Sequence, residues 1–203
     1  MRYRRADVPG ATYFFTVNLA DRSSRLLTER VADLREVVRK VQQAHPLRIV
    51  AWCVPPEHLH AVWELPEGDA DFSMCWGLIK VDFSRGIPPG ERIRDSRKHK
   101  GERGIWQRRF WEHLVRDEAD LQRTVDYTHY NPVKHGYVWR VCDWPYSSFH
   151  WYVRKGWLPV DWAVGDAFDG DFGEPGGDRG ALVGVPSSPQ PTVAAFFNDL
   201  RSI

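Results

Sequence analysis

The chain has 203 residues, enough for one domain with a real hydrophobic core and a short appendage. Its 28 Lys and Arg residues nearly balance 27 Asp and Glu residues, so the formal net charge of +1 excludes a strongly basic protein. Three cysteines without CxxC spacing exclude a disulfide scaffold and indicate reduced thiols. No apolar run approaches the ~18 residues of a membrane span, and the N-terminus has no signal-peptide pattern, so we expect a soluble, non-exported protein.

Charge is distributed unevenly along the chain. Between residues 85 and 109 the basic residues outnumber the acidic ones, and three more arginines lie near the N-terminus. The sequence therefore allows two interpretations, a phosphate-binding surface or a solvated loop. The basic residues concerned are Arg2, Arg4, Arg5, Arg85, Arg92, Arg94, Arg97, Lys98, Lys100, Arg103, Arg108 and Arg109.

The first half of the chain predicts a strand, a helix and two more strands. Residues 13–19 are apolar, aromatic and β-branched, which favours a strand. Thr28 can cap a helix whose apolar residues recur every three to four positions until Pro46. Residues 47–54 and 58–65 predict two strands, and the short turn at 55–57 makes them antiparallel neighbours.

The second half predicts two further helices around a fourth strand. Asp71 can cap a helix that carries an apolar stripe and ends at Gly86. A basic loop with Pro and Gly follows, and residues 105–115 predict the fourth strand. Asp117 can cap the next helix. This order favours an α+β, ferredoxin-like antiparallel sheet with helices on one face and the other face open.

The most informative motif is the pair His58 and His60 on the third predicted strand. Residues two apart on a strand point the same way, so both imidazoles leave one face. Two imidazoles at a loop mouth form half of a metal site, although they could also be polar residues on a half-exposed face. Asn131 could add an amide oxygen, and such a set suits Mn²⁺ or Mg²⁺ bound to phosphate oxygens.

Tyr127 is the candidate catalytic nucleophile. One helical turn places it on the same face as Asn131, whereas Pro132 biases Asn131 away from helical geometry. A phenol with an ordinary pKa of ~10 needs a nearby cation or base before it attacks phosphorus. Tyr130 is a rival, and Tyr127 could instead be a core residue. His129 points away from Tyr127, so we expect it to pack or to form a hydrogen bond.

Aromatic and basic residues alternate in the fourth predicted strand. Trp106, Phe110 and Trp111 with Arg108 and Arg109 could stack bases and contact phosphates. A half-buried strand with solvated arginines explains the same pattern equally well.

Taken together, these segments resemble the REP-associated tyrosine transposases, relatives of the single-tyrosine HUH insertion-sequence transposases. The resemblance spans roughly residues 2–166. It rests on Gly10–Thr16, Glu57–Trp63, Gly104–His113, Asp126–Gly136 and Asp143–Phe149.

The resemblance implies the HUH-endonuclease version of the fold and Mg²⁺- or Mn²⁺-dependent cleavage of single-stranded DNA through a 5′-phosphotyrosine intermediate. The substrate it implies is a repetitive extragenic palindrome, a DNA hairpin with a short flank, bound by a monomer in the bacterial cytoplasm at the nucleoid. It assigns the metal ligands to His58, His60 and Asn131, and the nucleophile to Tyr127. DNA contacts are expected from Arg4, Arg5, Arg97, Lys98, Arg108 and Arg109.

The expected domain organisation follows from the resemblance and from composition. Residues 1–138 would form the endonuclease domain, 139–164 an extension packed on it, and 165–203 a mobile, acidic, Gly- and Pro-rich tail. Pro55-Pro56-Glu57 departs from the family pattern before the first histidine but keeps a carboxylate. Two alternative functions remain: a non-catalytic binder of REP hairpins, and a metal-dependent phosphodiesterase acting on RNA or nucleotides.

Overall fold

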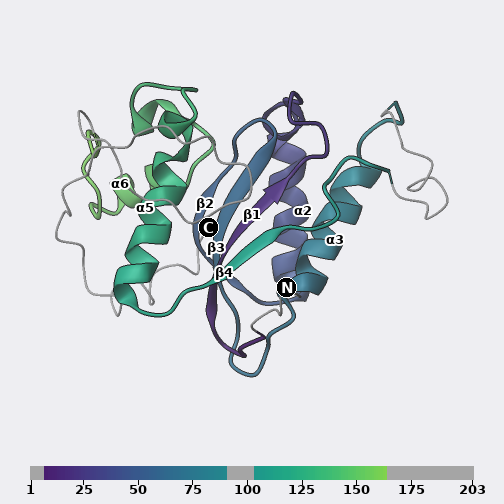
Figure 1. The fold of residues 1–203 in the computed structure, drawn as a ribbon, viewed down its shortest axis with the longest axis horizontal. Helices are drawn as coiled ribbons and strands as arrows, with labels where there is room; N and C mark the ends of the chain where they lie inside the picture. The colour runs from purple at the N-terminus through teal and green to yellow at the C-terminus, as the bar shows by residue number, and fades with distance from the viewer. Residues whose placement is uncertain (1–6, 91–102, 164–203) are drawn as a thin grey trace, which may run out of the picture.

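A computed structural model describes residues 7–90 and 103–163 of the chain. Figure 1 shows a sheet flanked by helices on both sides. The strands are β1 (Thr12–Asn18), β2 (Arg48–Cys53), β3 (His58–Glu64) and β4 (Trp111–Leu114). The helices are α1 (Leu26–Glu29), α2 (Val31–Ala44), α3 (Phe72–Arg85), α5 (Glu118–Lys134) and α6 (Phe149–Arg154), with a 3₁₀ turn η1 (Val141–Asp143).

The sheet confirms the predicted α+β, ferredoxin-like architecture. Its strand order is β2-β3-β1-β4, and every neighbouring pair is antiparallel. β1 and β3 are the central strands, and Thr16 lies opposite His60 while Asn18 lies opposite His58. The histidine motif is therefore in the middle of the sheet.

The two faces of the sheet carry separate hydrophobic cores. Helices α2 and α3 cover one face, as predicted, and pack on Phe15, Leu59 and Trp63. The prediction that the other face is open is wrong, because α5 and α6 pack across it around Phe14 and Val62. The histidine face is consequently an interface between a sheet and a helix.

Element ends follow the sequence signals only in part. Asp71 and Asp117 cap α3 and α5 by accepting hydrogen bonds from Met74 N and Asp120 N, as predicted. Thr28 does not cap a helix: it lies inside α1 and donates to the carbonyl of Arg25. The fourth strand is shorter than predicted, since only 111–114 pairs continuously with β1 and Trp106 forms an isolated bridge with Leu19.

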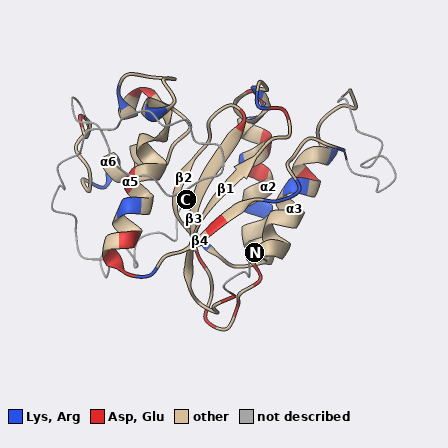
Figure 2. Cartoon of the chain, in the orientation of Figure 1, with Lys and Arg blue, Asp and Glu red and all other residues tan. Residues whose placement is uncertain are grey.

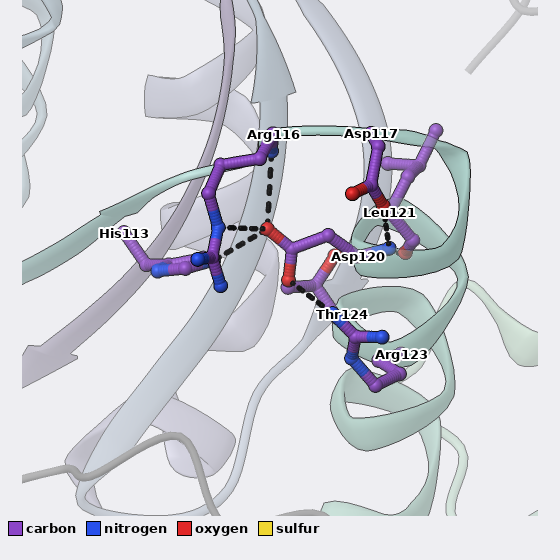
Figure 3. A network of polar contacts seen from close by, with 7 residues as sticks. All are labelled: His113, Arg116, Asp117, Asp120, Leu121, Arg123 and Thr124. Atoms are coloured by element: carbon purple, nitrogen blue, oxygen red, sulfur yellow. Dashed lines mark hydrogen bonds and ion pairs between the residues drawn. The ribbon is translucent and has the colours of Figure 1, made fainter.

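The start of α5 is fixed to β4 by a buried carboxylate. Asp120 is 1% exposed and its Oδ2 accepts from His113 Nε2 at 2.9 Å and from the backbone N of Arg116 at 3.0 Å. Its Oδ1 accepts from Arg123 at 3.1 Å. Figure 3 shows these groups converging on the one side chain. Burial alone would raise the pKa of Asp120, but the hydrogen bonds from Arg116 and His113 outweigh it and lower that pKa to about 2.

We expect Asp120→Asn to lower the free energy of unfolding by about 2 kcal/mol at neutral pH, because the carboxylate is held in its charged form. The carboxylate pKa falls on folding, so this stability is present above pH ~4 and is lost as the pH falls towards 2. Denaturant unfolding of both proteins between pH 7 and pH 3 measures the difference. Glu118→Gln, an exposed acid in the same first turn, is the control and should change stability by less than ~1 kcal/mol at any pH.

The chain after α5 packs onto the domain. Phe149, Tyr152, Leu158 and Trp162 are buried in the core shared by α5 and the sheet. Residues 165–203, for which a mobile tail was predicted, lie outside the described residues; they include Asp166, near which the family resemblance ends. Within the described ranges, no helix combines the length and the apolar character needed to cross a membrane.

Candidate functional site

His58 and His60 lie side by side on the α5 face of the sheet. Their ring centroids are 4.8 Å apart, and both side chains are buried. The shared face follows from the two-residue strand period, so this part of the prediction is confirmed. The alternative of polar residues on a half-exposed face does not hold, because α5 covers the pair.

Each imidazole has its Nδ1 engaged by a polar neighbour. Nδ1 of His58 is 2.9 Å from Glu57 Oε1, and Nδ1 of His60 is 3.0 Å from Thr16 Oγ1. A carboxylate can only accept here, so His58 Nδ1 donates to Glu57. A hydrogen bond that keeps the proton on Nδ1 leaves Nε2 with its lone pair, which is how metal-ligating imidazoles are commonly oriented.

Asn131 faces the first histidine from α5. Its Oδ1 is 3.2 Å from His58 Nε2, and the residue is fully buried. Both atoms are natural acceptors, so a hydrogen bond between them needs a proton on Nε2, and a metal ion can take the place of that proton. Two imidazoles and an amide oxygen thus form a donor set that fits a divalent cation. Among the described residues, no cluster of three His, Cys, Asp or Glu side chains provides another candidate.

The expected effect of Pro132 on Asn131 is wrong. Helix α5 continues through both residues to Lys134. Proline removes one backbone donor near the C-terminal end of the helix, while burial of Tyr127 and Asn131 against the sheet holds that turn in place.

Tyr127 lies one turn before Asn131 on the same helix face, as predicted. Its ring is 5.4 Å from that of His60 and packs edge-on against Phe14. Lys134 Nζ donates to the phenol oxygen at 3.1 Å and lies 4.5 Å from the ring centroid. The tyrosine is only 2% exposed, so a substrate can reach its hydroxyl only after the groups over it move.

Glu57 connects His58 to Tyr137, in the segment that follows α5. Its Oε2 accepts from the hydroxyl of Tyr137 at 2.9 Å, and Arg22 is 3.4 Å from its Oε1. Burial alone would raise the pKa of Glu57, but the hydrogen bond and charge of His58, with the Tyr137 hydroxyl, lower that pKa to about 2. The carboxylate is therefore charged at any physiological pH.

A tight helix ending brings Tyr137 back to the site. Gly136 has a φ of 70° and donates to Val133 O, while Tyr137 N donates to Pro132 O. This is a Schellman ending, which needs a left-handed residue and therefore favours glycine. Tyr137 then stacks against His135 and Trp144.

Burial keeps the imidazoles of His60 and His135 neutral. Burial holds the pKa of His60 well below its usual range, and the nearness of His58 and His135 adds to this effect because protonated imidazoles side by side would repel one another. Partial burial likewise lowers the pKa of His135 to about 4. His135 lies 5.1 Å from His58, ring centroid to ring centroid. Neutral imidazole is the form that can bind a metal ion.

Only two of the six predicted DNA-contacting residues lie within the described part of the chain. Arg108 and Arg109 are exposed, whereas Arg4, Arg5, Arg97 and Lys98 lie outside the described residues. Base stacking by Trp106 is contradicted, whereas Phe110 is only partly buried. Trp106 is 7% exposed and packs on Phe83, and Phe110 packs against the first core cluster. The half-buried interpretation of this segment is therefore confirmed for Trp106.

The remaining helical candidates have packing roles. His129 is buried and within 2.9 Å of Ser148 Oγ, which ties the extension to α5 as expected for that residue. Tyr130 is buried in the core cluster of the α5 face.

Sequence reasoning missed three side chains at the site. Thr16 was hidden in a strongly apolar strand, although strand pairing places it opposite His60. Lys134 is seven residues after Tyr127, a spacing of two helical turns that could have identified it. Tyr137 follows the helix-ending glycine, and no local pattern indicates its contact with Glu57.

Fold and site together define a ferredoxin-like α+β protein in which a sheet strand supplies two imidazoles and a helix supplies a tyrosine and an amide. The chain is 47% identical over 172 residues to the REP-associated tyrosine transposase of Escherichia coli (strain K12), covering 85% of this chain and 96% of that protein. A Haemophilus influenzae relative given the same family name is 44% identical over 161 residues, 79% of this chain and 92% of that protein. The chain therefore belongs to the REP-associated tyrosine transposases.

A solved structure of a REP-associated tyrosine transposase bound to a REP hairpin has the same fold. Its TM-score to this protein is 0.71 at 43% sequence identity, covering 89% of this chain and 98% of that one. A scan against protein-family models finds no match.

Proposed function

We propose that the chain is a metal-dependent endonuclease and strand transferase that acts on single-stranded DNA carrying REP-type hairpins, through a covalent 5′-phosphotyrosine intermediate. The observation that carries the proposal is the convergence of His58, His60, Asn131 and Tyr127 between β3 and α5. Membership of the family and the hairpin bound by the related structure support the choice of DNA as substrate.

The proposed reaction exchanges one phosphodiester for another. The Tyr127 oxygen attacks phosphorus, the bond from phosphorus to the 3′ oxygen breaks, and the DNA 5′ phosphate stays on the tyrosine. The phenol loses a proton and the leaving 3′ oxygen gains one, so the step is balanced. A free 3′ hydroxyl can reverse the exchange, which joins strands without an external energy source.

The chain's own groups prepare this attack. Lys134 places a positive charge beside the phenol oxygen, which favours the phenolate form that attacks. Because Lys134 lies over the ring, a phosphate group that draws its ammonium aside would uncover the hydroxyl in the same movement.

His58, His60 and Asn131 would hold the metal ion, Mg²⁺ or Mn²⁺. Bound there, the ion would act as a Lewis acid on a phosphodiester oxygen. Imidazole ligands favour Mn²⁺ over Mg²⁺ in affinity, and the cellular abundance of each ion decides which one is used.

Trapping the adduct tests the function directly. The full-length protein is incubated with Mn²⁺ and a hairpin DNA with single-stranded flanks, labelled on the side 3′ of the expected cut. We expect a labelled protein band that survives denaturation and a phosphotyrosine peptide containing Tyr127. Hairpin binding without any adduct would point to the non-catalytic hairpin binder. Cleavage of RNA or nucleotides without an adduct would point to the phosphodiesterase.

Tyr137→Phe should weaken Mn²⁺ binding by roughly ten-fold, the lower end of the effect of removing an outer partner of a metal ligand. The substitution removes the hydroxyl that holds Glu57 and keeps the ring stacked between His135 and Trp144. Calorimetric titration of the DNA-free protein measures the affinity. Tyr146→Phe, a half-buried tyrosine on the neighbouring chain segment, is the control. Equal affinities for the two variants would remove Tyr137 from the support of the site.

A further inference from the structure

A half-exposed arginine lies at the end of the sheet next to the first histidine. Arg22 is in the loop between β1 and α1, and its side chain is 49% exposed. Its Nη1 donates to Asn18 Oδ1, and its Nη2 lies 3.4 Å from Glu57 Oε1. Asn18 pairs with His58 across β1 and β3, so these contacts hold the guanidinium beside that histidine. Figure 2 shows basic segments in this loop, at the end of β1.

Arg22 is on the same side of the sheet as the candidate site. Its partner Glu57 also accepts hydrogen bonds from His58 Nδ1 and from Tyr137, which follows α5. Burial is the main reason for the low pKa of His60, and the charge of Arg22 is among the smaller causes that lower it further. The guanidinium is therefore close to the buried imidazoles in space.

Glu57 does not depend on Arg22 for its place. Its hydrogen bonds with His58 and Tyr137 are both 2.9 Å long, whereas the contact with Arg22 is 3.4 Å long and faces solvent. An incoming anion can therefore share the guanidinium while Glu57 keeps its two buried partners. The planar guanidinium offers several N–H donors in a fork, which suits two oxygens of one phosphate group.

Arg22 and Tyr127 lie towards opposite ends of the candidate site. Tyr127 packs on Phe14, which pairs with Val62 in the second half of β3. Arg22 contacts Glu57, just before β3 begins. The attacking and leaving oxygens of a phosphoryl transfer lie roughly in line. The strand that carries the leaving 3′ oxygen therefore extends away from Tyr127, towards Arg22.

We propose that Arg22 binds a backbone phosphate of the departing DNA strand, the phosphate next to the reacting one on its 5′ side. The proposal rests on the proposed function for the position of the reacting phosphate. A phosphodiester is an anion with two non-bridging oxygens, which the guanidinium fork can engage together. The contact reads no base, so it positions the strand without selecting its sequence. Its contribution weakens as salt rises.

Binding of the metal-free, full-length protein to a REP-type hairpin with single-stranded flanks tests the contact. Fluorescence anisotropy compares the wild type, Arg22→Gln and Arg22→Lys. The matched control is Arg30→Gln, because the Arg30 side chain is 45% exposed and also lies 3.4 Å from a carboxylate, that of Asp33. Each flank linkage is replaced in turn by an uncharged methylphosphonate. The cut is mapped separately with the wild-type protein and Mn²⁺.

We expect Arg22→Gln to weaken binding about tenfold at low salt and to lower the log–log salt slope by ~0.7, whereas Arg30→Gln changes neither. Arg22→Lys should keep the slope because it keeps the charge. A methylphosphonate one linkage 5′ of the cut should weaken binding by the wild type and leave binding by Arg22→Gln unchanged, because both changes remove the same contact. Calorimetric titration of DNA-free Arg22→Gln should show no loss of Mn²⁺ affinity, since the variant removes a positive charge near the imidazoles.

Equal effects of every methylphosphonate on the wild type and on Arg22→Gln would overturn the proposal, because repulsion from a less neutralised Glu57 acts on all linkages alike. Loss of Mn²⁺ affinity without a coupled linkage would instead assign Arg22 to the support of His58. Coupling at a linkage 3′ of the cut would overturn the assignment to the departing strand. A coupled linkage with no covalent adduct from the wild type keeps the phosphate contact and rejects the proposed function. An adduct without any coupled linkage does the reverse.

Discussion

Tyr127→Phe is expected to reduce cleavage of the flanked hairpin by at least roughly a thousandfold and to abolish the covalent adduct. The substitution removes the attacking oxygen and nothing else from the ring, which keeps its contacts with Phe14 and His60. Loss of the hydrogen bond from Lys134 should cost about 1 kcal/mol of stability or less. Hairpin binding should be nearly unchanged, and single-turnover cleavage measures the loss.

Tyr130→Phe is the matched control for this result. Tyr130 is a buried tyrosine on the same helix and was the rival candidate. If the Tyr127→Phe protein still forms an adduct and the Tyr130→Phe protein does not, the assignment of the nucleophile is wrong. If both variants retain the adduct, the tyrosine that reacts lies elsewhere in the chain.

His60→Ala is expected to remove most Mn²⁺ affinity, by roughly a hundredfold or more, together with cleavage. It deletes one of the two imidazoles, whereas Asn131→Ala should weaken binding less because water can replace an amide oxygen. Calorimetric titration of the DNA-free protein measures the affinity, and circular dichroism reports whether the fold is kept. Because His60 is fully buried, His60→Gln is made in parallel to preserve volume.

His129→Gln separates loss of a ligand from loss of a buried histidine. His129 is as buried as His60 and lies near Ser148, on another side of α5. The variant should lose stability while keeping its Mn²⁺ affinity. Unchanged Mn²⁺ affinity in both His60 variants would mean that His58 and His60 have only a structural role.

Local periodicity carried most of what could be predicted. The strand period places His58 and His60 on one face of β3, and the helix period places Tyr127 and Asn131 on one face of α5. Polar caps at Asp71 and Asp117 were predictable because the cap and its partner lie within three residues. These signals involve residues that are close in sequence. The ferredoxin-like architecture follows from the order in which the predicted strands and helices occur along the chain.

What the sequence could not show depends on contacts between distant residues. The second sheet face was expected to be open, since nothing in the strands indicates that α5 and α6 cover it. The same covering buries Tyr127 under Lys134 and joins Tyr137 to Glu57, 80 residues apart in the chain. Pro132 likewise suggested a helix break that tertiary packing overrides.

The division of the candidate site between a strand and a helix has a consequence for its lifetime. Its imidazoles are on the central strand β3, while its phenol and amide are on α5, which is held at one end by Asp120 and at the other by Gly136. Any opening that lifts α5 from the sheet takes the site apart without disturbing β3. Hydrogen exchange should therefore show the amides of Tyr127 and Asn131 exchanging together, and faster in Asp120→Asn, while those of β3 stay protected.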